Sequence, residues 1–163
     1  MTTESLPRFH LAVPVDDLSA AAVFYGQVLG CARGRSAAQW TDWNFHGHQL
    51  VTHLVERDPE SAANRLNPAG DHPAAALSLA AHNPVDGHDV PVPHFGLILT
   101  IPEFHDMADR LKAAGTAFEI EPYLRFAGEV GEQWTMFFHD PAGNAIEVKA
   151  FADDSQVFAV QIS

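Results

Sequence analysis

Two histidines and one glutamate have the residue types and positions expected of a metal site. His10 and His94 each open a short apolar segment, and Glu147 lies in another apolar segment near the C-terminal end. Cys31 is the only cysteine, so a metal ion has to be bound by nitrogen and oxygen. Two imidazoles and one carboxylate on one side of an octahedral ion leave the other side open for a substrate and dioxygen. This set suits non-haem Fe(II), and also Mn, Ni or Zn.

A further histidine lies in the late strand expected for the first half of the chain. This strand, residues 49–54, carries His53 and is the expected counterpart of the strand that carries Glu147. His53 is therefore a candidate fourth ligand or catalytic base. The alternative is a half-buried histidine on a strand that takes no part in chemistry.

An internal repeat could bring these residues together. Residues 9–30 and 94–115 each have the pattern of a strand followed by an amphipathic helix that ends at a glycine. In both copies a histidine lies in the strand, about twenty residues before that glycine. The first helix is expected to start at a cap formed by Asp16 or Asp17, and the second to hold Pro102 near its first turn.

Strand-like segments follow each helix, and they complete the predicted architecture. They are residues 40–55 in the first copy and 117–120, 134–138 and 145–151 in the second, with a tight turn at 140–144. The pattern predicts an α+β fold of two βαβββ modules that pair into a cupped, partly closed mixed β-sheet with flanking helices. Opposing first strands would then bring His10 and His94 to one cavity, with Glu147 approaching from the last strand.

We expect a single domain over residues 1–163. Its parts are module 1 (7–57), an insert (58–92), module 2 (93–152) and a C-terminal tail (153–163). Six of the 11 prolines lie between residues 58 and 93, which favours either a lid over the site or a poorly ordered linker. A short helical turn is expected near residues 74–81.

The composition and net charge limit the classes of molecule that the protein is expected to bind. With 9 Lys and Arg against 21 Asp and Glu, the formal net charge of −12 would repel nucleic acid and anionic membranes. No signal peptide or membrane-spanning apolar run is present in the sequence, so we expect a cytoplasmic protein that acts on a small molecule. A homodimer remains open, although both modules are present in one chain.

Four segments carry a resemblance to a known family. They are residues 9–18, 24–30, 93–96 and 140–147. Together they resemble the vicinal-oxygen-chelate superfamily, which includes glyoxalase I, extradiol dioxygenases, and bleomycin and fosfomycin resistance proteins. The resemblance covers most of the chain outside the insert, and it is more specific for the fold than for the reaction.

The resemblance also implies site residues. His10, His94 and Glu147 match the iron ligands of extradiol dioxygenases, whereas glyoxalase I would need a fourth ligand, usually Glu or Gln, where this chain has His53. The tyrosine that the dioxygenases commonly carry ten residues before the final glutamate is Phe137 here. The candidates to replace it are Tyr123, His46 and His48.

Three functions follow as hypotheses. The first is an Fe(II)-dependent extradiol-type dioxygenase acting on a small catechol-like substrate, in which a nearby histidine removes a hydroxyl proton. The second is a glyoxalase-like lyase or isomerase that uses Ni, Zn or Mn. The third is a resistance protein that binds a drug or metabolite without catalysis.

Overall fold

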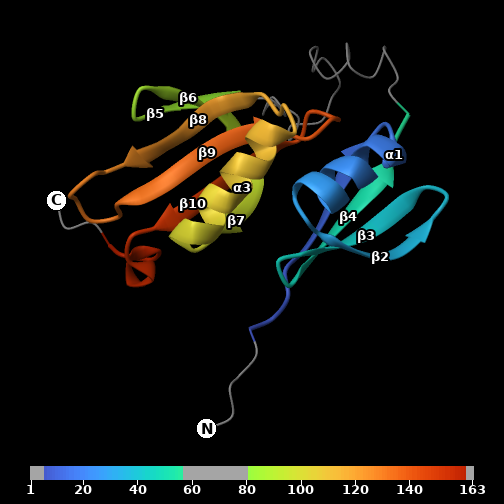
Figure 1. The fold of residues 1–163 in the computed structure, drawn as a ribbon, viewed down its shortest axis with the longest axis horizontal. Helices are drawn as coiled ribbons and strands as arrows, with labels where there is room; N and C mark the ends of the chain where they lie inside the picture. The colour runs from blue at the N-terminus through green and yellow to red at the C-terminus, as the bar shows by residue number, and fades with distance from the viewer. Residues whose placement is uncertain (1–5, 57–80, 161–163) are drawn as a thin grey trace, which may run out of the picture. The chain divides into compact units, whose positions relative to one another are not determined.

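The chain folds into two compact units, each built on one mixed four-stranded sheet (Figure 1). The computed structural model describes residues 6–56 and 81–160, and the division between the units falls after Glu56. The element order is βαβββ in both units, with an additional β-hairpin before the second. The predicted α+β fold of two βαβββ modules is therefore confirmed.

The first unit holds a helical segment and four strands. These are β1 (His10–Val15), α1 (Leu18–Ala21), the π-helical segment η1 (Ala22–Val28), β2 (Ala32–Ala37), β3 (Trp40–Phe45) and β4 (His48–Leu54). The sheet order is β1-β4-β3-β2, in which β1 runs parallel to β4 and the other pairs are antiparallel. Asp17 is the helix cap, because its carboxylate accepts the amides of Ser19 and Ala20. Gly30, at φ 74°, ends the helical segment as predicted.

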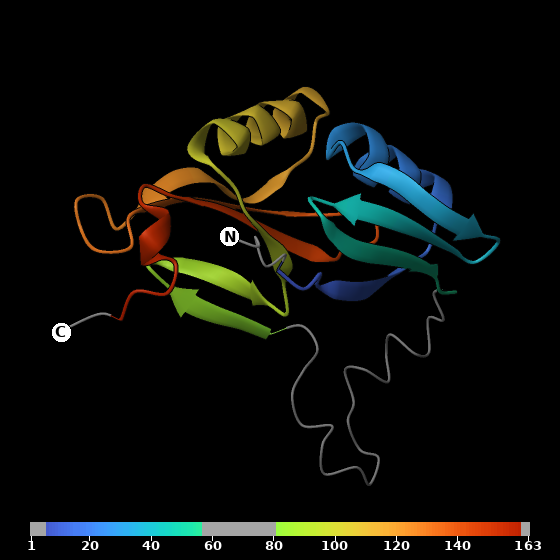
Figure 2. The same ribbon diagram turned by 90° about the horizontal axis from the view of Figure 1, so that it is seen from below.

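One face of the first sheet is covered by this helical segment, as Figure 2 shows. Tyr25 is fully buried and stacks on Trp43 of β3, with ring centroids 6.0 Å apart. Val13 and Val15 of β1 are buried on the same side. Because side chains alternate along a strand, His10 points to the opposite face, away from this helical segment.

The second unit repeats this arrangement and adds a hairpin. Its elements are β5 (Ala81–Val85), β6 (His88–Val92), β7 (Phe95–Ile98), α3 (Ile101–Ala113), β8 (Phe118–Arg125), β9 (Gln133–His139), β10 (Ala145–Phe151) and the 3-10 turn η2 (Asp154–Gln156). The main sheet has the order β7-β10-β9-β8, with β7 parallel to β10. This order matches that of the first unit strand for strand.

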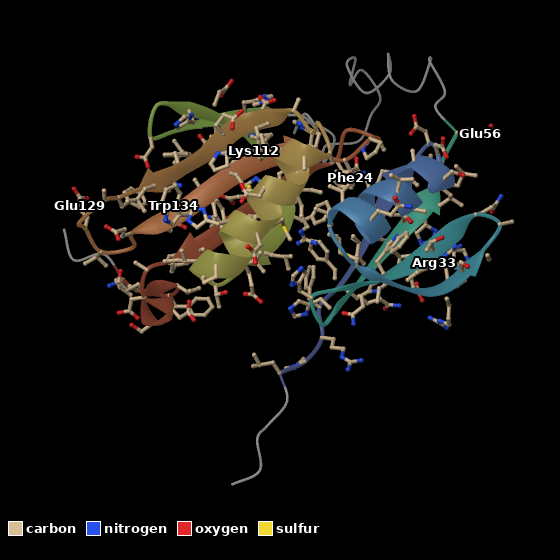
Figure 3. The ribbon with its side chains drawn as sticks, in the orientation of Figure 1. Phe24, Arg33, Glu56, Lys112, Glu129 and Trp134 are labelled. Atoms are coloured by element: carbon tan, nitrogen blue, oxygen red, sulfur yellow. The ribbon has the colours of Figure 1, made fainter. Side chains whose placement is uncertain are left out.

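The second sheet is covered on both faces (Figure 2). On one face lies α3, whose Phe104 is fully buried and packs near Trp134 of β9. Trp134 is labelled in Figure 3. On the other face lies the β5–β6 hairpin, in which Asp86 forms an ion pair with Arg125 of β8. The ring of His88 also contacts Tyr123 of β8, with centroids 4.6 Å apart. The hairpin is thus held against the face of the sheet that α3 leaves open.

The hairpin differs from the sequence prediction. Residues 81–92 were expected to belong to a lid or linker, but they form two antiparallel strands. The turn is Asp86-Gly87, and both residues have positive φ, 51° and 76°, as a two-residue type I′ turn requires. Of the helical turn expected near residues 74–81, residues 74–80 lie outside the described residues, and Ala81 begins β5.

Two strands of the fold differ from the sequence prediction. Strand β2 was not predicted, and β8 continues five residues beyond the expected end at Ile120. The predicted turn at 140–144 is present, and Asp140 holds it by accepting hydrogen bonds from the amides of Ala142 and Asn144.

Within the described residues, no helix is both long and apolar enough to cross a membrane.

Candidate metal centre

Glu147 lies at the centre of a polar cluster on β10. Its side chain is only 8% exposed, and its Oε1 accepts a hydrogen bond from the Thr135 hydroxyl at 3.0 Å. Its Oε2 lies 3.1 Å from His94 Nε2 and 3.2 Å from Lys149 Nζ. One carboxylate oxygen therefore contacts both an imidazole and an ammonium group.

The strand pairing explains how Glu147 and His94 meet. In the parallel pair β7–β10, Glu147 is the partner of Gly96, two residues after His94. Residues two apart on a strand share a face, so His94 and Glu147 point to the same side of the sheet. The structure thus brings together two of the three predicted metal ligands.

The second nitrogen of His94 has a partner from the hairpin region. Its Nδ1 lies 2.6 Å from the carbonyl oxygen of Pro91 in β6. A carbonyl can only accept, so Nδ1 carries the proton and Nε2 is directed towards Glu147. A histidine that binds a metal through Nε2 is commonly fixed in this way by a carbonyl on its other nitrogen.

The contact between His94 and Glu147 shifts the pKa values of both residues. The hydrogen bond to Glu147 raises the pKa of His94 above its usual 6.5, although partial burial works against it. Burial by itself would raise the pKa of Glu147, but the hydrogen bond from His94 and the charge of Lys149 outweigh it and hold the pKa below 4.5. Without metal, the two residues therefore form an ion pair across a range of pH.

This ion pair predicts how the stability of the metal-free protein depends on pH. The contribution of His94 is fully present below pH 6.5 and is lost as the pH rises through its raised pKa. The contribution of Glu147 is fully present above pH 4.5 and is lost as the pH falls through its lowered pKa. We expect His94→Gln to reduce the free energy of unfolding most between pH 4.5 and 6.5, measured by urea unfolding with a chelator present. A reduction that increases above pH 6.5 would contradict this assignment.

His10 lies on the face of the first sheet opposite the helical segment. Its Nδ1 is 2.8 Å from Oε1 of Gln49, its partner residue on β4. The amide oxygen accepts from Nδ1, so Nε2 is the ring nitrogen that could bind a metal, as Nε2 is in His94. A hollow of about 430 Å³ opens on this face, and Arg8, Asn44 and His48 line it beside His10.

The matching sheet order gives an internal comparison of the two units. If His10 corresponds to His94, the β1–β4 and β7–β10 registers make Val51 the counterpart of Glu147. His53 then corresponds to Lys149, two residues further along the strand. The sequence argument that made His53 the counterpart of Glu147 is therefore corrected, because the register sets a valine at that position.

The remaining predicted residues lie as follows. His53 is the β4 partner of Pro14, four residues along β1 from His10, which is ~13 Å of strand. His48 accepts the amide of Phe9 at its Nδ1, so its proton is on Nε2. His46 lies in the turn before β4 with φ 50°.

Tyr123 lies on the same face of its sheet as Glu147. It is the β8 partner of Thr135, which in turn is the β9 partner of Lys149. Burial raises the pKa of the Tyr123 hydroxyl above 10, so it remains protonated at neutral pH. Tyr123 is therefore a neutral hydrogen-bond donor and not a phenolate.

The geometry of His94 and Glu147 fits a shared metal ion. Two ligands at right angles on an ion with bonds of ~2.1 Å are ~3.0 Å apart, close to the 3.1 Å observed. Over the described residues, no group of three or more His, Cys, Asp or Glu side chains is close enough to hold a metal ion. A third protein ligand therefore has to come from outside the pair, and His10 remains the predicted one.

Sequence reasoning gave no role to three partners of this cluster, namely Lys149, Thr135 and Pro91. Strand alternation does place Lys149 beside Glu147, since it lies two residues later on the same face. The hairpin that carries Pro91 could have been found from the Asp86-Gly87 dipeptide, a strong signal for a two-residue turn. Thr135 required the register between β9 and β10, which depends on long-range pairing.

The fold defines a class of proteins built from repeated βαβββ units. The sequence of residues 9–148 matches the family model of the Glyoxalase/Bleomycin resistance protein/Dioxygenase superfamily. The chain therefore belongs to this superfamily. The extradiol branch within it stays a prediction.

Solved structures agree with this membership. A glyoxalase/bleomycin resistance protein/dioxygenase from Alicyclobacillus acidocaldarius is 29% identical, with a TM-score of 0.66 over 93% of this chain and 96% of that one. A fosfomycin resistance protein from Listeria monocytogenes is 16% identical, with a TM-score of 0.60 over 93% and 98%. A lactoylglutathione lyase from Agrobacterium tumefaciens is 16% identical, with a TM-score of 0.54 over 98% and 100%. At this identity the last two share the fold alone.

Proposed function

We propose that the protein is a metal-dependent enzyme of the extradiol-dioxygenase type that acts on a small catechol-like molecule. His10, His94 and Glu147 would hold one divalent ion, with Fe(II) as the native metal. The observation that carries the proposal is the His94–Glu147 pair at 3.1 Å, with Nδ1 of His94 fixed by Pro91. The matching Nδ1 contact of His10 with Gln49 supports the third ligand.

The ligand count favours this type over a glyoxalase-like lyase or isomerase. A fourth ligand of the glyoxalase kind would be expected at the counterpart of Glu147, which is the apolar Val51. His53 is ~13 Å of strand from the position of His10, near the limit that two imidazoles on one ion can span. We therefore assign three protein ligands and leave His53 out of the metal site.

The iron would bind two neighbouring substrate oxygens and provide the chemistry with dioxygen. The residues of the chain have separate tasks. Tyr123 stays protonated and would donate a hydrogen bond to a substrate oxygen. It would take the role of the tyrosine that extradiol dioxygenases commonly carry at the position of Phe137. His48 has Nδ1 occupied by the Phe9 amide, which suits it to donate from Nε2 rather than to accept a proton. His53 is then the histidine left as the candidate base.

The test is oxygen uptake by protein loaded anaerobically with Fe(II). With a panel of substituted catechols, we expect uptake coupled to the visible absorbance of a ring-opened product. Tyr123→Phe should lower kcat by about 10–100-fold while iron content stays unchanged. The matched control is Tyr25→Phe, a change in the core of the first unit. The proposal fails if the iron-loaded protein consumes no more oxygen with any catechol than free Fe(II) does.

A further inference from the structure

Lys149 is a cation placed directly beside the proposed metal ligand. It lies two residues after Glu147 on β10, and its Nζ is 3.2 Å from Glu147 Oε2. This is the same oxygen that His94 Nε2 approaches to 3.1 Å. The Lys149 side chain is 29% exposed, so its amine is neither sealed in the core nor free in solvent.

Among the described residues, the strand neighbours of Lys149 in its own row carry no negative charge. Thr135 and Tyr123 continue the same row across β9 and β8, and both are neutral. The next row holds Arg125, which pairs with Asp86 of the hairpin. Glu147 is therefore the only carboxylate that the described contacts give to Lys149.

A metal ion at Glu147 and His94 changes the charge balance of this cluster. The ion brings two positive charges to the oxygen that Lys149 contacts, and like charges at such a distance repel strongly in a partly buried site. The sum of the ion, Glu147 and Lys149 is then +2. A negative group on the ligand can neutralise it by lying between the metal and Lys149 Nζ.

We infer that Lys149 selects anionic ligands, and that an ionised ligand oxygen lies between the bound metal and its Nζ. This inference rests on the metal site of the proposed function and adds the charge of the substrate to it. The ligand class is a small molecule with two neighbouring oxygens, of which at least one is ionised when bound. The formal charge of −12 on the whole chain would by itself favour cationic ligands. The preference for an anionic ligand therefore comes from the local charge of Lys149.

The test uses Co²⁺ as the metal and two small chelating probes. Oxalate carries two negative charges, and oxamide is its neutral diamide with the same pair of neighbouring oxygens. Lys149→Met, Lys149→Arg and Lys112→Met are compared with the original chain. Lys112 is the only other lysine and lies exposed near the end of α3 (Figure 3), so it is the matched control.

We expect Lys149→Met to bind Co²⁺ about tenfold more tightly, because a like charge is removed from beside the ion. The same variant should bind oxalate at least ~10-fold more weakly, with oxamide binding unchanged. Lys149→Arg should retain most of the oxalate affinity, and Lys112→Met should match the original chain. The readouts are calorimetric titration and the visible absorbance of bound Co²⁺.

The outcomes separate the two proposals. If the original chain binds no Co²⁺, the metal site of the proposed function fails, and this inference falls with it. If Co²⁺ binds but Lys149→Met leaves oxalate affinity unchanged, only the role of Lys149 is overturned. If Lys149→Met weakens Co²⁺, oxalate and oxamide alike, the lysine has a structural role and the inference is likewise overturned.

Discussion

Glu147→Gln is expected to lower the affinity for a divalent metal ion at least ~100-fold. An amide has nearly the shape of the carboxylate but no charge, and amides are weak ligands for Fe(II) or Zn²⁺. The fold should survive the change, because a glutamine can still accept the hydrogen bond from Thr135 through its amide oxygen. The measurements are calorimetric titration with Zn²⁺ and metal content after gel filtration.

The matched control is Glu129→Gln, the same chemical change in the exposed loop between β8 and β9 (Figure 3). It should bind metal as the original chain does. Circular dichroism and the unfolding temperature of both variants would establish that they are folded. Glu147→Gln with unchanged metal affinity would remove this carboxylate from the site.

Gly96→Ala is expected to destabilise the second unit by at least about 3 kcal/mol, the upper end of the cost of overpacking. A Cβ at residue 96 would lie 1.5 Å from the carbonyl oxygen of Glu147 and 2.6 Å from its carbonyl carbon. Both atoms belong to the backbone of β10, so no side chain can move aside. Strands β7 and β10 would have to separate at the register that aligns Gly96 with Glu147.

The control for this prediction is Gly26→Ala in η1. There the new Cβ would lie 3.4 and 3.8 Å from ring carbons of Trp43, and alanine favours a helix over glycine by about 0.5–1 kcal/mol. The unfolding temperature of Gly26→Ala should stay close to that of the original chain, whereas that of Gly96→Ala should fall by roughly 10 °C. A normal unfolding temperature for Gly96→Ala would show that the strands are not this close.

The elements that could be predicted from the sequence are those set by local pattern. The strand 145–151 was predicted with the bounds of β10, and the glycines that end both helical segments were predicted from their position. Hydrophobic periodicity and helix-stop signals are properties of neighbouring residues, so one sequence is enough to find them. The repeat of these signals then indicates the duplicated βαβββ order.

The features that could not be predicted depend on pairing between distant segments. The register that makes Val51 rather than His53 the counterpart of Glu147 is set by which residues of β1 and β4 align. A shift of one residue would reverse the face of every side chain, and nothing in a single strand specifies that alignment. For the same reason the contact between His94 and Pro91 was not predicted, since it requires the hairpin to be folded.

The candidate site was predicted in part. Residue type and strand position indicated His94 and Glu147, and the structure brings these two side chains together. Lys149 was given no role in the site, although strand alternation places it on the same face as Glu147. The convergence of His10 with this pair stays a prediction.

The most direct test of the three-ligand site is a crystal structure of protein soaked with Zn²⁺, with anomalous data collected at the zinc edge. We expect one strong peak bonded to His10 Nε2, His94 Nε2 and a Glu147 oxygen, each at ~2.0–2.2 Å. A peak held by His94 and Glu147 without His10, or no peak at this pair, would contradict the account.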